Sequence, residues 1–184
     1  MYKKLFIFSF LTLLLSSWAM APQLFYNVSK GSIDFRSDAP MELIKASSRE
    51  LKGIFDATKK QFAFSVFVRS FSGFNSPLQL EHFNENYLES DKYPRASFDG
   101  KIIEDVDLHN DGNYTIRAKG NLTIHGVVQE RIIKCDLTVN NKVVTIRSHF
   151  TVLLADYNIP IPKVVHEKLA SEIKVEVKAD LIEK

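Results

Sequence analysis

Residues 172–181 alternate strictly between polar and apolar side chains. Ile173, Val175 and Val177 are separated by Lys174 and Glu176. Successive side chains of a β-strand point to opposite faces, so this pattern predicts a strand with one buried face and one solvated face. Strands of this kind build antiparallel sheets, because parallel sheets are usually covered on both faces.

The same period of two recurs along most of the chain. It is found in five further stretches, at residues 31–37, 61–70, 113–124, 133–139 and 143–152. Asn110–Asn113 and Asn140-Asn141 are typical of tight turns, and His125-Gly126 indicates a turn or a bulge. We therefore predict an all-β, antiparallel fold of about eight strands, the number at which a closed barrel has an interior of side-chain or single-ligand size.

Two segments depart from this alternation. Ser76-Pro77 followed by Gln79 is a capping-box signature with proline at the first helical position. The apolar residues that follow recur at helical spacing: Leu80, Phe83 and Tyr87. The pattern predicts a short amphipathic helix that ends at Tyr93-Pro94. Residues 161–173 predict one or two further helical turns before the last strand.

Residues 1–21 have the pattern of a secretory signal peptide. Two lysines precede a short apolar run, and small residues follow. The run is shorter than the roughly 20 apolar residues of a membrane-spanning helix. Cleavage is expected after Ala19 or after Ala21, leaving one domain at residues 22–184 without a stable membrane anchor. The lysine-led leader predicts a bacterial protein that is periplasmic, or secreted.

The composition of residues 22–184 excludes one large class of partner. The chain has 24 basic and 22 acidic residues, and the leader holds two of the lysines, so 24 − 2 = 22 basic residues balance 22 acidic ones. A neutral chain without a Lys/Arg stripe gives nucleic acid no electrostatic footprint. It also lacks the polybasic patch that would hold a protein to an anionic membrane.

The chain has a single cysteine, Cys135, so no internal disulfide can form. Its alternating neighbours Ile133 and Leu137 predict a small buried hydrophobe rather than a nucleophile. A disulfide-linked homodimer is possible only if this thiol is exposed.

No motif points to catalysis, a metal or a cofactor. His82 and Glu85 are three residues apart on the expected helix, which is a weak ligand pattern that a surface pair explains equally well. There is no Gly-x-Ser-x-Gly elbow and no glycine-rich phosphate loop. We therefore expect a protein that is not an enzyme and that needs neither metal nor cofactor.

The aromatic content is unusual in its distribution, since eight of the 14 Phe residues lie between Phe25 and Phe74. Apolar side chains on both faces near the end of the stretch 61–70 are compatible with a helix packed outside or with an apolar interior. Proteins line ligand cavities mostly with hydrophobic and aromatic groups. A filled core and a ligand cavity explain these residues about equally well.

Three stretches of the chain contain motifs in a characteristic order. The first contains a Gly-x-Phe element at Gly53–Phe55, and the second contains His82 followed by Lys92–Phe98. The third is the Leu-Thr-Ile-His-Gly-Val turn at Leu122–Val127. In order and spacing the chain resembles the YceI-like family of exported bacterial proteins over residues 24–182, although Val128–Glu130 stand where that family usually has Thr-Lys-Pro.

The resemblance implies an eight-stranded, lipocalin-like antiparallel barrel with one or two short helices and a long apolar lumen. Some relatives hold a polyisoprenoid chain or a similar amphiphile there. On this basis we expect the following residues to form the lumen wall: Ile33, Phe35, Phe62, Phe64, Val66 and Phe98. Three helix residues are expected to close one end: Phe83, Tyr87 and Leu88. Four polar residues are expected to meet the ligand's head: His82, Asn84, Asn86 and Tyr93.

The function that follows is an exported protein that sequesters or carries an isoprenoid or fatty-acyl amphiphile. Two alternatives stay open at this point. One is a stress or adhesion module whose barrel is filled by its own side chains. The other is an enzyme acting on a hydrophobic substrate, which would need a polar cluster inside the barrel.

Overall fold

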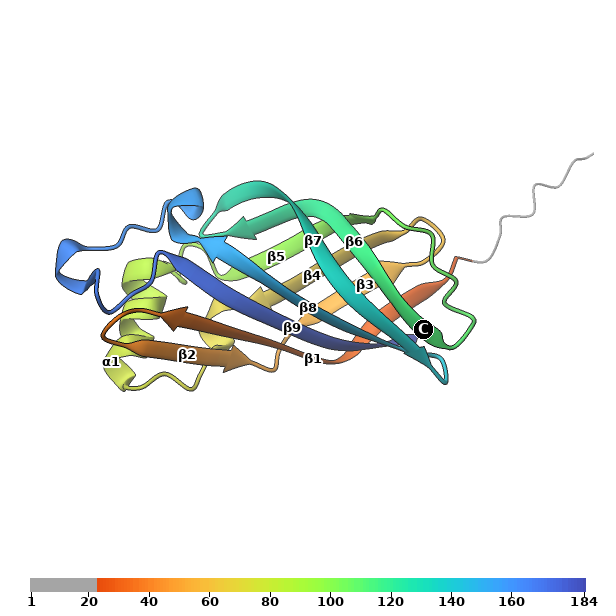
Figure 1. Cartoon of the computed structure of the whole chain (residues 1–184), viewed down its shortest axis with the longest axis horizontal. Helices are drawn as coiled ribbons and strands as arrows, with labels where there is room; N and C mark the ends of the chain where they lie inside the picture. Colours follow the sequence, from red (N-terminus) through yellow and green to blue (C-terminus); the bar gives the residue numbers. More distant parts are fainter. Residues whose placement is uncertain (1–22) are drawn as a thin grey trace, which may run out of the picture.

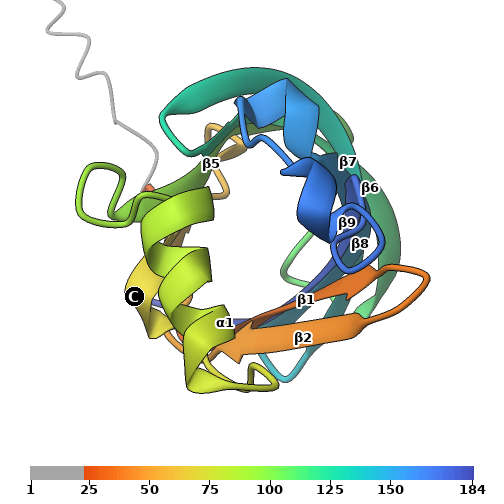
Figure 2. The ribbon, with the colours of Figure 1, turned by 90° about the vertical axis from the view of Figure 1, so that its left-hand side faces the viewer.

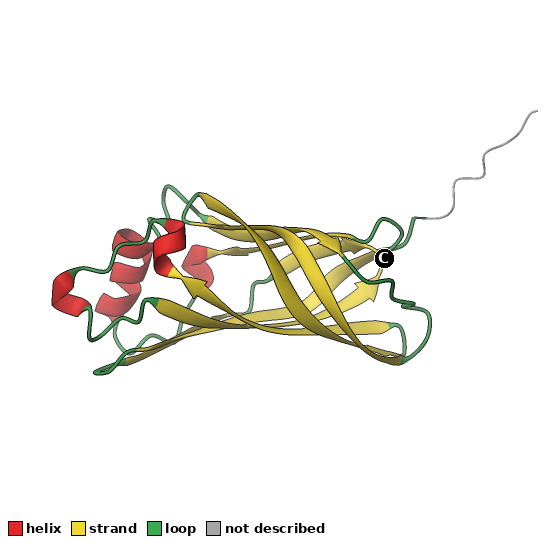
Figure 3. Cartoon of the chain, turned by 45° about the horizontal axis from the view of Figure 1, so that its top comes forward, coloured by secondary structure: helices red, strands yellow, loops and turns green. Residues whose placement is uncertain are grey.

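The computed structural model describes residues 23–184, and the predicted signal peptide with both candidate cleavage sites lies outside the described residues. Nine strands form one antiparallel sheet that closes on itself through the pairing of β1 with β9 (Figures 1 and 3). The strands are β1 (Phe25–Asp38), β2 (Leu43–Ser48), β3 (Lys52–Asp56), β4 (Gln61–Phe67), β5 (Arg95–Ile102), β6 (Gly112–Ile124), β7 (Val127–Asn140), β8 (Val143–Leu153) and β9 (Glu172–Glu183).

Strands β2 and β3 occupy one position in the barrel wall. Both pair antiparallel with β1, and the pairs Ile33↔Ser48 and Asn27↔Ile54 continue in a single register. The nine segments therefore fill eight strand positions. The predicted all-β, eight-stranded antiparallel barrel is confirmed.

Two of the hairpins use turns whose central residues both have positive φ. These are His125 (φ 51°) with Gly126 (φ 70°), and Asn141 (φ 49°) with Lys142 (φ 66°). Such turns match the right-handed twist of the flanking strands. The predicted turn at His125-Gly126 is confirmed, and the second turn lies one residue later than Asn140-Asn141.

The predicted helix begins where expected but ends early. α1 (Pro77–His82) continues as a π-helical turn, η2 (Phe83–Tyr87). The Ser76 hydroxyl accepts the backbone N–H of Gln79 at 3.2 Å, as an N-cap does. The prediction that the helix reaches Tyr93 is wrong, because Glu89 takes a left-handed conformation (φ 42°) just after the helix.

The remaining helical pieces are single 3-10 turns: η1 (Val68–Ser70), η3 (Leu154–Tyr157) and η4 (Lys163–Val165). η4 confirms the predicted helical turn before the last strand. Figure 2 looks at the end of the barrel where α1 lies on one side and the segments of η3 and η4 lie on the other. No helix among residues 23–184 is long and apolar enough to cross a membrane.

The opposite end of the barrel is filled by a packed core. Its buried members include Tyr26, Phe55, Leu108, Val139 and Leu181. We call this the closed end. It lies where the first described residues and the C-terminus meet the sheet (Figure 1).

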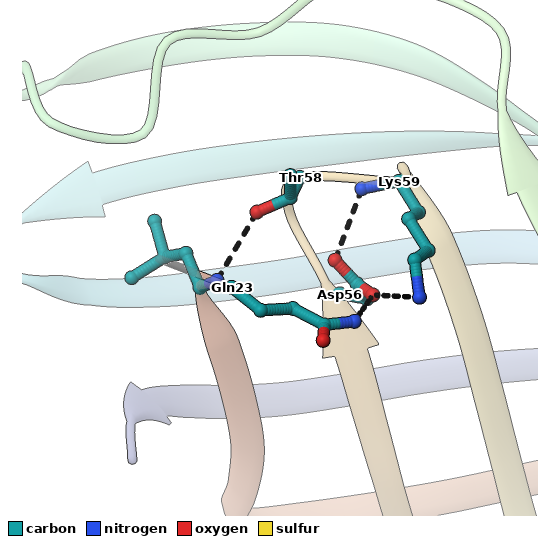
Figure 4. Close-up of polar contacts among 5 residues, drawn as sticks. Gln23, Asp56, Thr58 and Lys59 are labelled. Carbon is teal, nitrogen blue, oxygen red and sulfur yellow. Dashed lines mark hydrogen bonds and ion pairs between the residues drawn. The ribbon is translucent and has the colours of Figure 1, made fainter. Parts of the chain in front are cut away.

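A polar cluster at the closed end ties down the start of the described chain (Figure 4). The Gln23 side-chain amide donates to Asp56 Oδ2 at 2.5 Å, and the backbone N–H of Lys59 donates to Asp56 Oδ1 at 3.0 Å. The Lys59 ammonium lies 3.8 Å from the same carboxylate. These contacts attach residue 23 to the turn between β3 and β4.

Candidate functional site

The barrel encloses a cavity of about 480 Å³. Side chains from all nine strands line it, together with α1, η2 and the segment around η4. Its volume lies within the range of roughly 300–1,000 Å³ that is usual for small-molecule sites. The interior is therefore hollow rather than fully filled by side chains.

The inward face of β4 contributes two of the phenylalanines in the wall. Phe62, Phe64 and Val66 alternate toward the cavity, and Phe98 of β5 packs against Phe62 with ring centroids 4.9 Å apart. Ile33 and Phe35 of β1 also line the cavity. The structure thus brings together all six residues that the sequence suggested for the wall.

Gly53 explains how Phe64 fits beside its neighbours. The two residues are paired across β3 and β4, and a Cβ atom at position 53 would lie 2.1 Å from Phe64 Cδ1. The absence of a side chain at Gly53 lets the Phe64 ring lie over the backbone of β3. This gives a physical reason for the Gly-x-Phe element at Gly53–Phe55.

Four phenylalanines join the helix to the barrel. Phe83 of η2 packs against Phe35 (5.5 Å between centroids, stacked), Phe71 (5.8 Å) and Phe74 (5.0 Å). This cluster lies beside β2, whose outer edge pairs with no further strand among residues 23–184 and carries the isolated bridge Ser47↔Ser72. The helix therefore completes the wall where strand pairing stops.

The cavity opens at the end where α1 and η4 lie. We call this opening the mouth. Four polar or charged side chains line it: Glu42, Gln79, His82 and Lys168. The Gln79 amide donates to Glu42 Oε1 at 2.5 Å. Of the residues that line the cavity, only Glu42 and Lys168 are acidic or strongly basic, and both lie at this mouth.

The interior below the mouth has few polar groups. The Ser148 hydroxyl donates to the backbone carbonyl of Lys134 at 2.8 Å, and Ser37 Oγ accepts the backbone N–H of Ala170 at 2.9 Å. Cys135 is buried in the wall, as predicted, and burial raises the pKa of its thiol. Within residues 23–184 no group of three or more His, Cys, Asp or Glu side chains could hold a metal ion.

The helix residues predicted to close one end, Phe83, Tyr87 and Leu88, line the cavity, and so does His82. Tyr93 does not line it. Its ring packs edge-on against His125 at 4.8 Å and covers Gly126, where a Cβ atom would lie 2.3 Å from the ring. Contacts with the turn between β6 and β7 therefore keep Tyr93 away from the mouth.

Asn84 and Asn86 are not among the lining residues either. The Asn84 side chain donates to the carbonyl of Leu80 at 3.0 Å, which turns it toward its own helix. Sequence reasoning missed three of the four mouth residues: Glu42, Gln79 and Lys168. Gln79 was predicted only as part of the helix cap, and Glu42 and Lys168 show no local signal because each reaches the mouth only through the fold.

These features define a class of protein: an antiparallel barrel with a deep apolar cavity that is closed at one end and polar at the other. A model of the YceI-like domain matches residues 27–181. The chain belongs to the YceI-like family. Among curated proteins, no sequence relative matches it.

Solved structures share this fold at low sequence identity. A polyisoprenoid binding domain from Saccharophagus degradans is 13% identical, with a TM-score of 0.74, covering 86% of this chain and 98% of that one. Burkholderia cenocepacia BcnA is 14% identical, with a TM-score of 0.67 and coverage of 82% and 95%. The Campylobacter jejuni YCEI protein is 15% identical, with a TM-score of 0.58 and coverage of 73% and 82%.

Proposed function

We propose that this protein binds the apolar chain of an amphiphile inside its barrel. The observation that carries the proposal is the cavity of about 480 Å³, apolar along its length, with its acidic and strongly basic residues confined to the mouth. An amphiphile has the same polarity, with one apolar tail and one polar head. The tail would lie toward the closed end and the head at Glu42, Gln79, His82 and Lys168.

Burial of the tail supplies the binding free energy. Each methylene group removed from water contributes about 0.8 kcal/mol, from which the cost of ordering a flexible chain is subtracted. The walls need no polar contact with such a ligand, which agrees with the hydrogen bonds that Ser37 and Ser148 already make to the backbone. An isoprenoid or a fatty-acyl chain has this chemistry, and the name of the Saccharophagus domain supports the isoprenoid.

We propose binding rather than catalysis. Reaction of a hydrophobic substrate in the barrel would call for an ionisable group beside its reacting atoms. Most ionisable side chains that line the cavity lie at the mouth. The exceptions are the Cys135 thiol and the Tyr87 phenol, and burial raises the pKa of each. Both groups are therefore held in their neutral forms.

We further propose that the protein acts after export, in the periplasm or outside the cell. The pattern of residues 1–21 supports this location. A single cysteine within a large core is compatible with it, since the fold relies on no disulfide.

Titration of delipidated protein with a fluorescent fatty acid tests the proposed binding. We expect one saturable site from which unlabelled prenols and fatty acids displace the probe. Ligand at a concentration 100 times its Kd should stabilise the fold by about 2.7 kcal/mol, seen as a higher midpoint of thermal unfolding. Absence of saturable binding, with no shift of that midpoint, would refute the proposal.

A further inference from the structure

Large apolar side chains surround the mouth and are exposed to solvent. Met41 between β1 and β2, Leu78 in α1 and Val164 in η4 are 67%, 56% and 88% exposed. Leu78 itself lines the opening of the cavity, and the other two are next in sequence to lining residues. We call these three residues the apolar rim.

Hydrogen bonds join the three segments of the apolar rim into one surface. The Gln79 amide donates to Glu42 Oε1 at 2.5 Å, which links α1 to the turn between β1 and β2. The backbone N–H of Met41 donates to the carbonyl of Glu167 at 2.8 Å, which links that turn to the segment after η4. The exposed apolar side chains therefore surround a single opening.

Two lysines beside Val164 add positive charge to this surface. Lys163 and Lys168 are exposed and take part in no ion pair among residues 23–184. Glu42 and Glu167 belong to the same surface, so the formal charge of these four side chains is zero (2 − 2 = 0). The ammonium of Lys163, which is next to Val164 and unpaired among the described residues, can still meet a lipid phosphate.

We propose that the apolar rim docks reversibly on the surface of a lipid bilayer, so that the mouth opens against the membrane. This inference rests on the proposed function, because a membrane is where an amphiphilic ligand resides. Exposed apolar patches bordered by polar groups mark interaction surfaces, and the ammonium of Lys163 beside Val164 suits a lipid phosphate. When the mouth is docked, fewer methylene groups of the lipid tail are exposed to water as the tail moves between the bilayer and the cavity. Each methylene group exposed to water raises the free energy of this transfer.

The contact is transient rather than a permanent anchor. Residues 22–184 have a formal charge of zero and no polybasic stretch, so a few apolar side chains supply most of the attraction. The double variant Met41→Ser/Val164→Ser removes two of them without touching a cavity-lining residue. The matched control is Val128→Ser/Ile132→Ser, which removes side chains of 56% and 57% exposure from β7.

Flotation with phosphatidylcholine vesicles, with and without phosphatidylglycerol, measures docking. All preparations should have the same N-terminus by intact mass, so that the leader contributes nothing to the differences. We expect the rim variant to float about tenfold less than the wild type, and the control variant to float normally. Lys163→Glu should reduce flotation only with the anionic vesicles.

A second measurement separates docking from ligand binding. Titration with a soluble fluorescent fatty acid, in the absence of vesicles, should give the same affinity for the wild type and both double variants. The docking proposal would be overturned if the wild type did not float, or if the rim variant floated as well as the wild type. It would also be overturned if the rim variant and the control variant lost flotation equally. Rim-dependent self-association without lipid would overturn it too. A wild type that fails the soluble titration would instead contradict the proposed function.

Discussion

Phe64 and Phe67 show how one strand serves two environments. Both belong to β4, but Phe64 lines the cavity whereas Phe67 is 42% exposed. The Arg95 guanidinium lies 3.9 Å from the centroid of the Phe67 ring. Substitutions at these two positions therefore compare the inside and the outside of the wall within a single element.

Phe64→Glu is expected to abolish binding of a fluorescent fatty acid. An ionised carboxylate in an apolar cavity has no partner and disfavours both its own burial and that of a lipid tail. Phe67→Glu is the control, because its carboxylate would meet solvent and Arg95. Far-UV circular dichroism should show the same β-sheet content in both variants. Retained binding in folded Phe64→Glu protein would mean that the wall has been assigned incorrectly.

Asp56 predicts a dependence of stability on pH. Burial alone would raise the pKa of this carboxyl, but the Gln23 amide, the backbone N–H of Lys59 and the Lys59 ammonium outweigh burial and lower that pKa. Because the pKa is lower in the folded state, the ionised carboxyl stabilises the fold at pH values above the unfolded-state pKa of about 3.9. This stabilisation is lost as the pH falls through the folded-state pKa.

Urea denaturation of wild type and Asp56→Asn measures this contribution. We expect the variant to be less stable at neutral pH, and the difference in unfolding free energy to shrink once the carboxyl of the wild type is protonated. A difference that stays constant from neutral to strongly acidic pH would show that the charge of Asp56 does not contribute.

At the scale of elements, α1 and η2 are attached to the barrel mainly by side chains. No residue of either is fully buried, and within the described chain no backbone hydrogen bond joins residues 77–87 to a strand. Phe83 makes the principal aromatic contacts, with Phe35, Phe71 and Phe74. Tyr87 and Leu88 also pack on the barrel core, but the contacts of Phe83 are the ones that a single substitution removes together.

Phe83→Ala is expected to weaken the attachment of residues 77–88 by about 2 kcal/mol, since a half-buried ring is removed. Hydrogen exchange should accelerate in that segment and stay unchanged in β6 to β9. Glu85→Ala, at an exposed position of the same turn, is the control. Uniformly faster exchange throughout the barrel would mean that the helix is part of the global core instead.

Long strands could be predicted from the sequence because their alternation is a local property. The period of two located β4, β6, β8 and β9 and about half of β1 and of β7, and the capping residues located the start of α1. β2 and β3 had no such signal, since each is only five or six residues long. The end of the helix could not be predicted, because the hydrogen bond between Glu89 and His125 (2.6 Å) joins residues 36 apart.

The same distinction applies to the site. The wall was predictable because Phe62, Phe64 and Val66 form one face of one strand. The mouth was not, because Glu42 and Lys168 belong to segments that meet only when the barrel closes. Tyr93 has the chemistry of a mouth residue, but its contact with Gly126 depends on the turn between β6 and β7.

At the scale of the whole molecule, the two ends of the barrel differ in a way that suits an amphiphile. Tyr26, Leu108 and Leu181 fill the closed end beyond the cavity, since none of them lines it. Charged groups and exposed apolar residues meet at the other end. One orientation of an amphiphile, with the tail inward and the head at the mouth, follows from this asymmetry.

Native mass spectrometry of the protein freshly isolated from its cells shows whether the barrel holds a ligand. We expect a mass above that of the polypeptide by one amphiphile. Organic extraction should remove this amphiphile, and it should be absent from Phe64→Glu protein and present in Phe67→Glu protein. Amphiphile binding would be contradicted if all ions had the mass of the polypeptide alone and the same protein took up no added single-chain amphiphile.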